Sequence, residues 1–205
     1  MEKESKYQTS ISNSKSDEGN GIVINNSKDV IIENNIIKNI LDPSKTDDYN
    51  NGSTLLPGYG ISILNSERAN ITNNKGRSFE SVFYAEYSQK FGIYENEFTL
   101  SNYGIKYGFN NANTKIENNS IIDNVGWYVM DVPEGPRGYG IFLNNSAVNI
   151  SISQNNINNN YMGISIDANN STGIVITSNL IADNSLDGIR FNAEYDLAEK
   201  WLNLS

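Results

Sequence analysis

An asparagine that returns at a nearly constant interval is the feature that most constrains this chain. Successive copies lie 39, 22, 23, 36 and 24 residues apart, so the basic unit is 22 to 24 residues long. A period of this size indicates stacked supersecondary units, and the two long steps indicate insertions into an otherwise regular array. These anchor asparagines are Asn35, Asn74, Asn96, Asn119, Asn155 and Asn179.

Within each unit, apolar and polar residues alternate, as they do in a strand with one buried face. Aligning the units on the anchor places the apolar residues in columns along three short strands. The first strand supplies Ile22, Ile61, Val82, Ile105, Ile141, Ile164 and Ile189, then Ile24, Ile63, Tyr84, Tyr107, Leu143, Ile166 and Phe191. The second supplies Val30, Ala69, Phe91, Thr114, Ile150 and Ile174, then Ile32, Ile71, Ile93, Ile116, Ile152 and Ile176; the third supplies Ile37, Gly76, Phe98, Ile121, Ile157 and Ile181.

The composition agrees with short strands joined by polar corners. The 205 residues include 35 Asn and 26 Ile; Ile favours strands, whereas Asn disfavours regular structure and suits turns. We therefore predict an all-β fold over residues 21–192, a single-stranded parallel β-helix with three sheets and about seven turns. Successive turns would be spaced by about 4.8 Å.

The two ends of the chain differ from the repeat. Residues 1–20 are polar and are predicted to be a lead-in or a first partial turn. Residues 193–205 place Leu197, Trp201 and Leu204 at helical spacing, i, i+4 and i+7. Because an exposed strand edge promotes association, we predict that this segment forms a short C-terminal helical cap.

The asparagines have a structural interpretation that needs no ligand. At the corner between the second and third strands, an inward amide can satisfy backbone groups and stack on the next copy. We therefore predict a ladder of the anchor asparagines. A second set follows the third strand and is expected to occupy the next corner: Asn39, Asn124, Asn160 and Asn184.

The repeats resemble those of a known superfamily. The stretches 21–39 and 163–184 resemble the parallel β-helix repeats of pectin-lyase-like proteins, in the NosD-like style of archaeal adhesin-like surface proteins. The resemblance covers residues 20–192 and implies a right-handed coil. It does not imply one activity, since members include pectate lyases, polygalacturonases, epimerases, phage tailspikes and noncatalytic surface proteins.

Two insertions, at residues 41–57 and 125–137, interrupt the array at the same corner. Each leads into a Gly-Tyr-Gly-Ile segment, at 58–61 and 138–141. Their attachment points are predicted to lie three turns, about 14 Å, apart, so the loops would wall a groove that combines aromatic rings with charged groups, as sugar sites do. The candidate ligand-binding residues are Asp47, Asp48, Tyr49, Arg77, Lys106, Trp127, Tyr128, Asp131, Glu134 and Arg137, with Glu80, Phe83 and Tyr103 on the nearby floor.

Structural alternatives exist for the same residues. Trp127 and Tyr128 could pack beneath their own loop, and the charged residues could form a solvated rim. Tyr59, Tyr103 and Tyr139 precede the first-strand glycines and could form either an exposed row or an inward corner stack. The inward stack explains them equally well or better, because the following glycine is expected on the outer face and alternation then sends its predecessor inward.

The composition limits the chemistry available. Without His, the chain lacks the usual neutral-pH base and the Gly-His-Gly element of polygalacturonases, and no catalytic residue is assigned. We expect no cofactor and no metal site, although Asp47 and Asp48 could hold Ca²⁺ weakly. A net charge of −9 argues against nucleic acid, and no segment has the length of apolar sequence that a membrane span needs.

Nine Asn-x-Ser/Thr sequons hint at an exposed, glycosylated location, which is extracellular or the cell surface. The leading hypothesis is a noncatalytic β-helix module, a stalk, filament or adhesin-like segment, whose two loops contact a glycan or a neighbouring surface-protein subunit. The alternative is a polysaccharide lyase or glycoside hydrolase with its cleft between the loops. The sequons begin at Asn25, Asn51, Asn70, Asn118, Asn144, Asn149, Asn169, Asn170 and Asn203.

Overall fold

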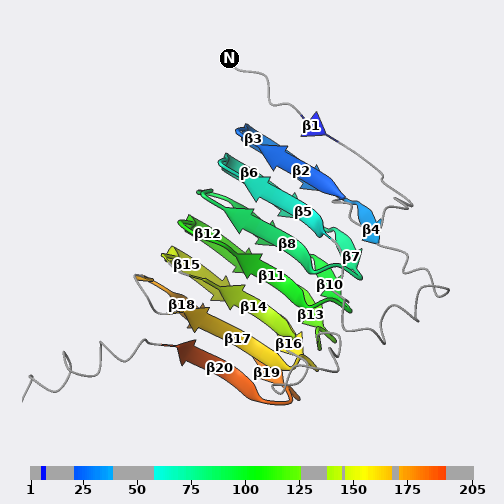
Figure 1. Ribbon diagram of the computed structural model, residues 1–205, viewed down its shortest axis with the longest axis vertical. Coiled ribbons are helices and arrows are strands. Elements are labelled where there is room, and N and C mark those ends of the chain that lie inside the picture. The colour runs from blue at the N-terminus through cyan, green and yellow to red at the C-terminus, as the bar shows by residue number, and fades with distance from the viewer. Residues whose placement is uncertain are drawn as a thin grey trace, which may run out of the picture.

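The chain folds as a stack of short parallel strands. The computed structural model describes residues 6–7, 21–38, 58–125, 138–144, 146–167 and 171–192, and every regular element in these ranges is a strand. Each turn of the coil gives one strand to each of three parallel sheets, and successive turns lie one above the next (Figure 1). The predicted three-sheet parallel β-helix of about seven turns is therefore confirmed.

The three sheets are named in the order in which each turn visits them. The first sheet contains β2 (Ile22–Asn25), β5 (Tyr59–Leu64), β8 (Ser81–Glu86), β11 (Tyr103–Tyr107), β14 (Tyr139–Leu143), β17 (Met162–Asp167) and β20 (Asp187–Asn192). The second contains β1 (Lys6–Tyr7), β3 (Lys28–Glu33), β6 (Glu67–Thr72), β9 (Gly92–Tyr94), β12 (Ala112–Glu117), β15 (Val148–Ser153) and β18 (Val175–Thr177). The third contains β4 (Ile36–Lys38), β7 (Lys75–Arg77), β10 (Glu97–Thr99), β13 (Ser120–Ile122), β16 (Asn156–Asn158) and β19 (Leu180–Ala182).

The core is a thin axis of stacked apolar side chains. In the first sheet Ile24 pairs with Ile63, and Leu143 pairs with Ile166, as the columns predicted. The third turn corrects the alignment by one residue, because Ile61 pairs with Phe83 rather than with Val82. As a consequence Tyr84, which was assigned to an inner column, lies on the outer face.

The predicted asparagine ladder runs along the second corner without a break. The Nδ2 of each anchor donates to the Oδ1 of the next, and the five bonds measure 2.9 to 3.1 Å. The same Nδ2 of Asn119 also donates to the carbonyls of Ile93 and Glu117, while its Oδ1 accepts from the backbone N–H of Asn96. One buried amide thus satisfies backbone groups of two successive turns.

Two further ladders occupy the other corners. At the third corner Asn124, Asn160 and Asn184 are linked in the same way, which confirms the predicted set; Asn39 lies outside the described residues. At the first corner a serine ladder was not predicted: the N–H of Ser27 donates to Oγ of Ser66, whose N–H donates to Oγ of Ser88. In the sequence, the signal for this serine ladder is a polar residue that directly follows the residue at each first corner.

The corners also explain why asparagine is so abundant. Among the described residues, 21 that are not glycine have positive φ, and they recur at fixed places in each turn, as with Asn26, Asn65 and Asn110 at the first corner. Left-handed geometry costs an ordinary L-residue roughly 1–2 kcal/mol, and Asn adopts it more readily than other side chains. The repeat therefore selects Asn both for its amide and for its backbone.

In the last described turn, the side chains of the inner columns are exposed. Ile189 and Phe191 of β20 are 42% and 63% exposed, although their partners Ile164 and Ile166 are buried. No described strand lies on the far side of β20. The predicted helical cap, residues 193–205, lies outside the described residues, and most of the predicted lead-in does too, apart from β1, which pairs with β3.

We expect Asn119→Ala to lower the free energy of unfolding by about 2–4 kcal/mol, because it strands buried donors and acceptors that the amide satisfies. The neighbouring Asn118 is exposed and has a φ of 56°, so Asn118→Gly keeps the corner geometry and should change stability little. Urea denaturation of both variants tests this difference. Equal losses would show that the ladder amide has no special role.

Tyr107 offers a substitution that is expected to stabilise the fold. Its side chain is fully buried in an inner column, and its hydroxyl has no hydrogen-bond partner within normal geometry among the described residues. Burial raises the pKa of this phenol, which keeps it neutral. Tyr107→Phe should therefore raise the free energy of unfolding by about 1 kcal/mol, whereas Ile105→Ala in the same strand should lower it by about 2–4 kcal/mol. A destabilised Tyr107→Phe would contradict the assignment.

Candidate functional site

The two insertions attach at the third corner, as the sequence predicted. One insertion lies between β4 and β5, and the other lies between β13 and β14. In the first sheet, β14 is the third strand after β5. The residues predicted to line the loops lie outside the described residues, so the proposed walls of the groove stay a prediction. They are Asp47, Asp48, Tyr49, Trp127, Tyr128, Asp131, Glu134 and Arg137.

The described floor residues fall in different places. Lys106 lies on the outer face of the first sheet, whereas Arg77 is exposed on the third sheet, where its neighbour across β4 is Lys38. The structure therefore does not bring Arg77 and Lys106 together. Phe83 is buried in an inner column, so its prediction as a floor residue is wrong.

The tyrosines before the first-strand glycines face outward. A Cβ added to Gly104 would lie 2.5 Å from Cγ2 of Ile121 and 3.2 Å from Nδ2 of Asn124, both of which are interior. The glycine thus faces inward, and Tyr103 before it faces outward. The inward corner stack favoured from the sequence is wrong, because strict alternation breaks where the chain turns into the first sheet: Gly104 and Ile105 are both buried.

The outward rings form two stacked groups along the first sheet, which we call the aromatic face. Tyr59 and Tyr84 stack with centroids 4.3 Å apart and planes within 9°. Tyr103 and Tyr139 stack at 5.1 Å and 4°, and Phe142 tilts against both, at 5.7 and 5.1 Å. Adjacent turns place these rings at contact distance, since strand spacing is about 4.8 Å.

Charged groups lie among these rings. Lys106 donates to Glu80 at 2.8 Å, and its Nζ lies 4.5 Å from the centroid of Tyr103. The hydroxyl of Tyr84 donates to Glu86 at 3.0 Å. Both members of the Lys106–Glu80 pair are largely shielded, at 21% and 27% side-chain exposure. The face thus combines flat apolar rings with fixed charges and hydrogen-bonding groups.

The environment raises the pKa of two phenols of this face, those of Tyr84 and Tyr59, and keeps them neutral. Burial raises the pKa of Tyr84 well above its usual range, and its hydrogen bond to Glu86 raises it further. Burial also raises the pKa of Tyr59, with the nearby carboxylate of Glu80 adding to the effect. At neutral pH the hydroxyls are therefore donors as well as acceptors.

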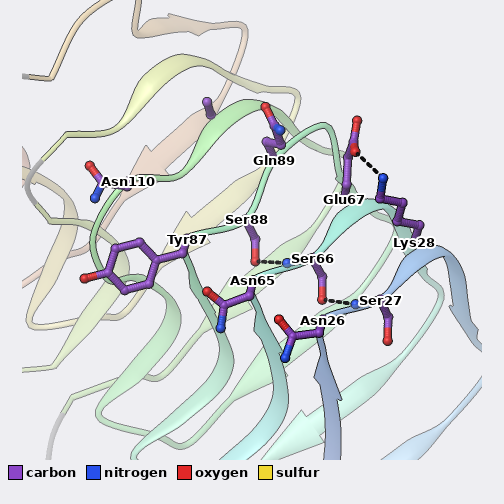
Figure 2. Close-up of a pocket in the computed structure, with 11 residues that line it drawn as sticks. Asn26, Ser27, Lys28, Asn65, Ser66, Glu67, Tyr87, Ser88, Gln89 and Asn110 are labelled. Atoms are coloured by element: carbon purple, nitrogen blue, oxygen red, sulfur yellow. Dashed lines mark hydrogen bonds and ion pairs between the residues drawn. The ribbon is translucent and has the colours of Figure 1, made fainter.

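A groove at the first corner was not predicted from the sequence. This groove has a volume of about 490 Å³ and crosses four successive turns. Figure 2 shows Asn26, Asn65, Tyr87 and Asn110 in a row, with the serine ladder behind them and the Lys28–Glu67 ion pair at one side. The described residues that line it are Asn26, Ser27, Lys28, Asn65, Ser66, Glu67, Tyr87, Ser88, Gln89, Asn110 and Ala112.

The described residues offer no group of three acidic side chains that could hold a metal ion. Asp47 and Asp48, the predicted weak Ca²⁺ contact, lie outside the described ranges. In the part of the chain that the structure describes, no helix has the length and hydrophobicity needed to cross a bilayer. Among the described sequon asparagines, Asn144 is half-buried and the others are exposed, namely Asn25, Asn70, Asn118 and Asn149. The remaining predicted sites lie outside the described residues: Asn51, Asn169, Asn170 and Asn203.

The chain belongs to the right-handed β-helix region family, whose model matches residues 20–196. This match agrees with the pectin-lyase-like coil that the repeats resemble. No curated protein matches the chain.

Several solved structures are similar to this chain. DFA-IIIase from Arthrobacter chlorophenolicus A6, solved in complex with DFA-III, is 15% identical with a TM-score of 0.51; the similarity covers 74% of this chain and 35% of that one. A mutant of the same enzyme gives a TM-score of 0.53 at 14% identity. Tailspike protein 2 of Bacteriophage CBA120 is 11% identical over 91% of this chain and 34% of its own, with a TM-score of 0.42. The chain thus spans about a third of the length of these proteins, and the likeness concerns the fold alone.

The raised pKa of Tyr84 predicts its behaviour in alkali. The folded state favours the neutral phenol, so this contribution to stability is complete below about pH 10 and is lost as the pH rises through the raised pKa. In an ultraviolet titration, Tyr84→Phe should remove one phenol from the late-ionising group. Loss of an early-ionising phenol instead would contradict the assigned environment; circular dichroism checks that the chain stays folded.

Proposed function

We propose that this chain is a rigid β-helix module that binds a glycan on the aromatic face. The observation that carries the proposal is the two pairs of stacked, nearly parallel rings, Tyr59 with Tyr84 and Tyr103 with Tyr139, on one outer sheet face. Aromatic rings on an outer sheet face offer apolar surface to sugar rings, while Glu80 and Lys106 beside them offer partners for hydroxyl groups.

The rigidity of the coil supports binding without closure. Backbone hydrogen bonds and three side-chain ladders fix the strands that carry the rings, so little conformational entropy is lost when a ligand binds. The two insertions lead into β5 and β14, which carry Tyr59 and Tyr139 of this face, and we propose that Trp127 and Tyr128 add further glycan contacts. An extracellular or cell-surface location is part of the proposal, and the exposed sequon asparagines support it.

A second candidate function is glycan cleavage at the same face. It is favoured by the two carboxylates there, Glu80 and Glu86, because glycoside hydrolysis uses a pair of carboxyl groups. Known proteins of this fold include the DFA-IIIase solved with DFA-III, which makes an enzyme a reasonable alternative. Both carboxylates already have partners, Lys106 and Tyr84, which favours binding as the first proposal.

The binding site can be tested with little risk to the fold by introducing a residue type that already occurs at the equivalent position of another turn. Ser81 occupies the column of Tyr103 and Tyr139, so Tyr139→Ser places a residue that the column already accepts. We expect Tyr139→Ser to lower affinity at least about tenfold, or by 1.4 kcal/mol, for a glycan that the wild type binds through the aromatic face. Tyr94→Ser on the second sheet, whose column contains Ser153 and Thr72, is the matched control.

The outcomes separate the candidates. Equal binding by wild type and Tyr139→Ser would reject the aromatic face as the site. The double variant Trp127→Ala/Tyr128→Ala tests the loops separately. Release of reducing ends or unsaturated uronate from polysaccharide, abolished by Glu80→Gln, would replace the binding proposal with the enzymatic one.

A further inference from the structure

The groove at the first corner presents a row of side chains parallel to the coil axis. Asn26, Asn65, Tyr87 and Asn110 occupy equivalent places in four successive turns and lie side by side (Figure 2). With strands spaced by about 4.8 Å, the row is about 14 Å long. All four side chains are exposed, although they belong to backbone positions that are rigidly fixed.

Tyr87 is a residue of this groove whose side chain the fold alone does not explain. Its φ is 50°, a left-handed conformation that is unfavourable for a bulky side chain and is taken by Asn at the three equivalent corners. Its side chain is 52% exposed, so burial in the core does not compensate for this conformation. An asparagine at position 87 would suit the corner better, which indicates that the ring is there for a contact outside the fold.

The chemistry of the groove selects among classes of ligand. The exposed amides of Asn26, Asn65, Asn110 and Gln89 each donate and accept hydrogen bonds, which matches the mixed donors and acceptors of sugar hydroxyls. The ring of Tyr87 supplies the flat apolar surface that a sugar face needs.

The charged groups at the groove are already neutralised. Glu67 accepts from Lys90 at 2.8 Å and lies 3.2 Å from Arg68 and 3.7 Å from Lys28. The hydrogen bond from Lys90, together with the surrounding positive charges, lowers the pKa of Glu67, so this carboxylate stays ionised at neutral pH. It is suited to holding the wall of a binding groove and not to donating a proton.

A peptide is a poorer match for the same surface. Peptides dock by adding a strand to a free edge or by inserting apolar side chains into pockets. Here the corner N–H groups are already used within the coil: Asn26 donates to Leu64, Asn65 to Glu86 and Tyr87 to Phe109. Apart from the ring of Tyr87 and the small Ala112, the described lining is polar.

We propose that the first-corner groove is a second binding site, which takes an extended neutral glycan running along the coil axis over Tyr87 and the asparagine row. This site lies at a different corner from the loops and does not depend on the aromatic face. A chain with both sites would hold a polysaccharide at two points, so that binding to a long polymer would be tighter than binding to a short fragment.

The test uses cellohexaose, xylohexaose and mannohexaose as neutral probes, with the full chain. Titration followed by side-chain amide signals in NMR should perturb Asn and Gln NH₂ groups, and calorimetry gives the affinity. Tyr87→Asn should weaken binding of the responding hexasaccharide at least about tenfold while leaving the chain as stable as the wild type or more stable. Loss of affinity therefore cannot be assigned to unfolding.

Leu100→Asn is the matched control. Leu100 is also exposed and left-handed, with a φ of 52°, but it lies at the third corner, away from the groove. It should bind like the wild type. Unchanged affinity in Tyr87→Asn, or no binding of any of the three probes, would overturn the groove proposal. Binding lost in Tyr139→Ser but kept in Tyr87→Asn would also overturn it and would support the aromatic face alone, whereas the reverse result would support the groove alone.

Discussion

The structure depends on hydrogen bonds for the buried polar groups at the three corners of each turn of the coil. Strands in a parallel stack bond to the turns above and below, but a corner exposes backbone groups to a dry interior. The buried amide of Asn96 illustrates the solution: it donates to the carbonyls of Ile71 and Tyr94 and to Oδ1 of Asn119. Without such side chains the corners would carry unsatisfied buried groups, and the narrow apolar axis is too small to offset their cost.

These rigid corners also position the surfaces that face solvent. Because each turn repeats the same backbone, a side chain at one outward place is followed by its counterpart about 4.8 Å away. Tyr103 and Tyr139 stack for this reason, and the row through Asn65 and Tyr87 forms in the same way. A coil of this type thus turns sequence periodicity into linear surfaces, and a linear polymer is the natural ligand for them.

The sequence predicted the structure correctly wherever the same type of residue recurs at the same position of every turn. The second-corner ladder and most of the inner columns followed from spacing alone, because Asn recurs at every place of the ladder and apolar residues recur at nearly every inner place. The third turn was misaligned by one residue at Phe83, since Val82 is apolar as well and is also buried. The serine ladder of Ser27, Ser66 and Ser88 was missed because serine is common at any turn.

The sequence by itself determined the period, the three-strand unit, the ladder asparagines and the corner at which the loops enter, since these depend on local alternation and residue type. Only the tertiary structure decided which way the tyrosines before the glycines point, because that depends on how Gly104 faces inward against Ile121 of β13. It also separated Arg77 from Lys106 and revealed the groove beside Tyr87. These features arise from the stacking of turns that the chain brings together across 22 or more residues, which no local pattern records.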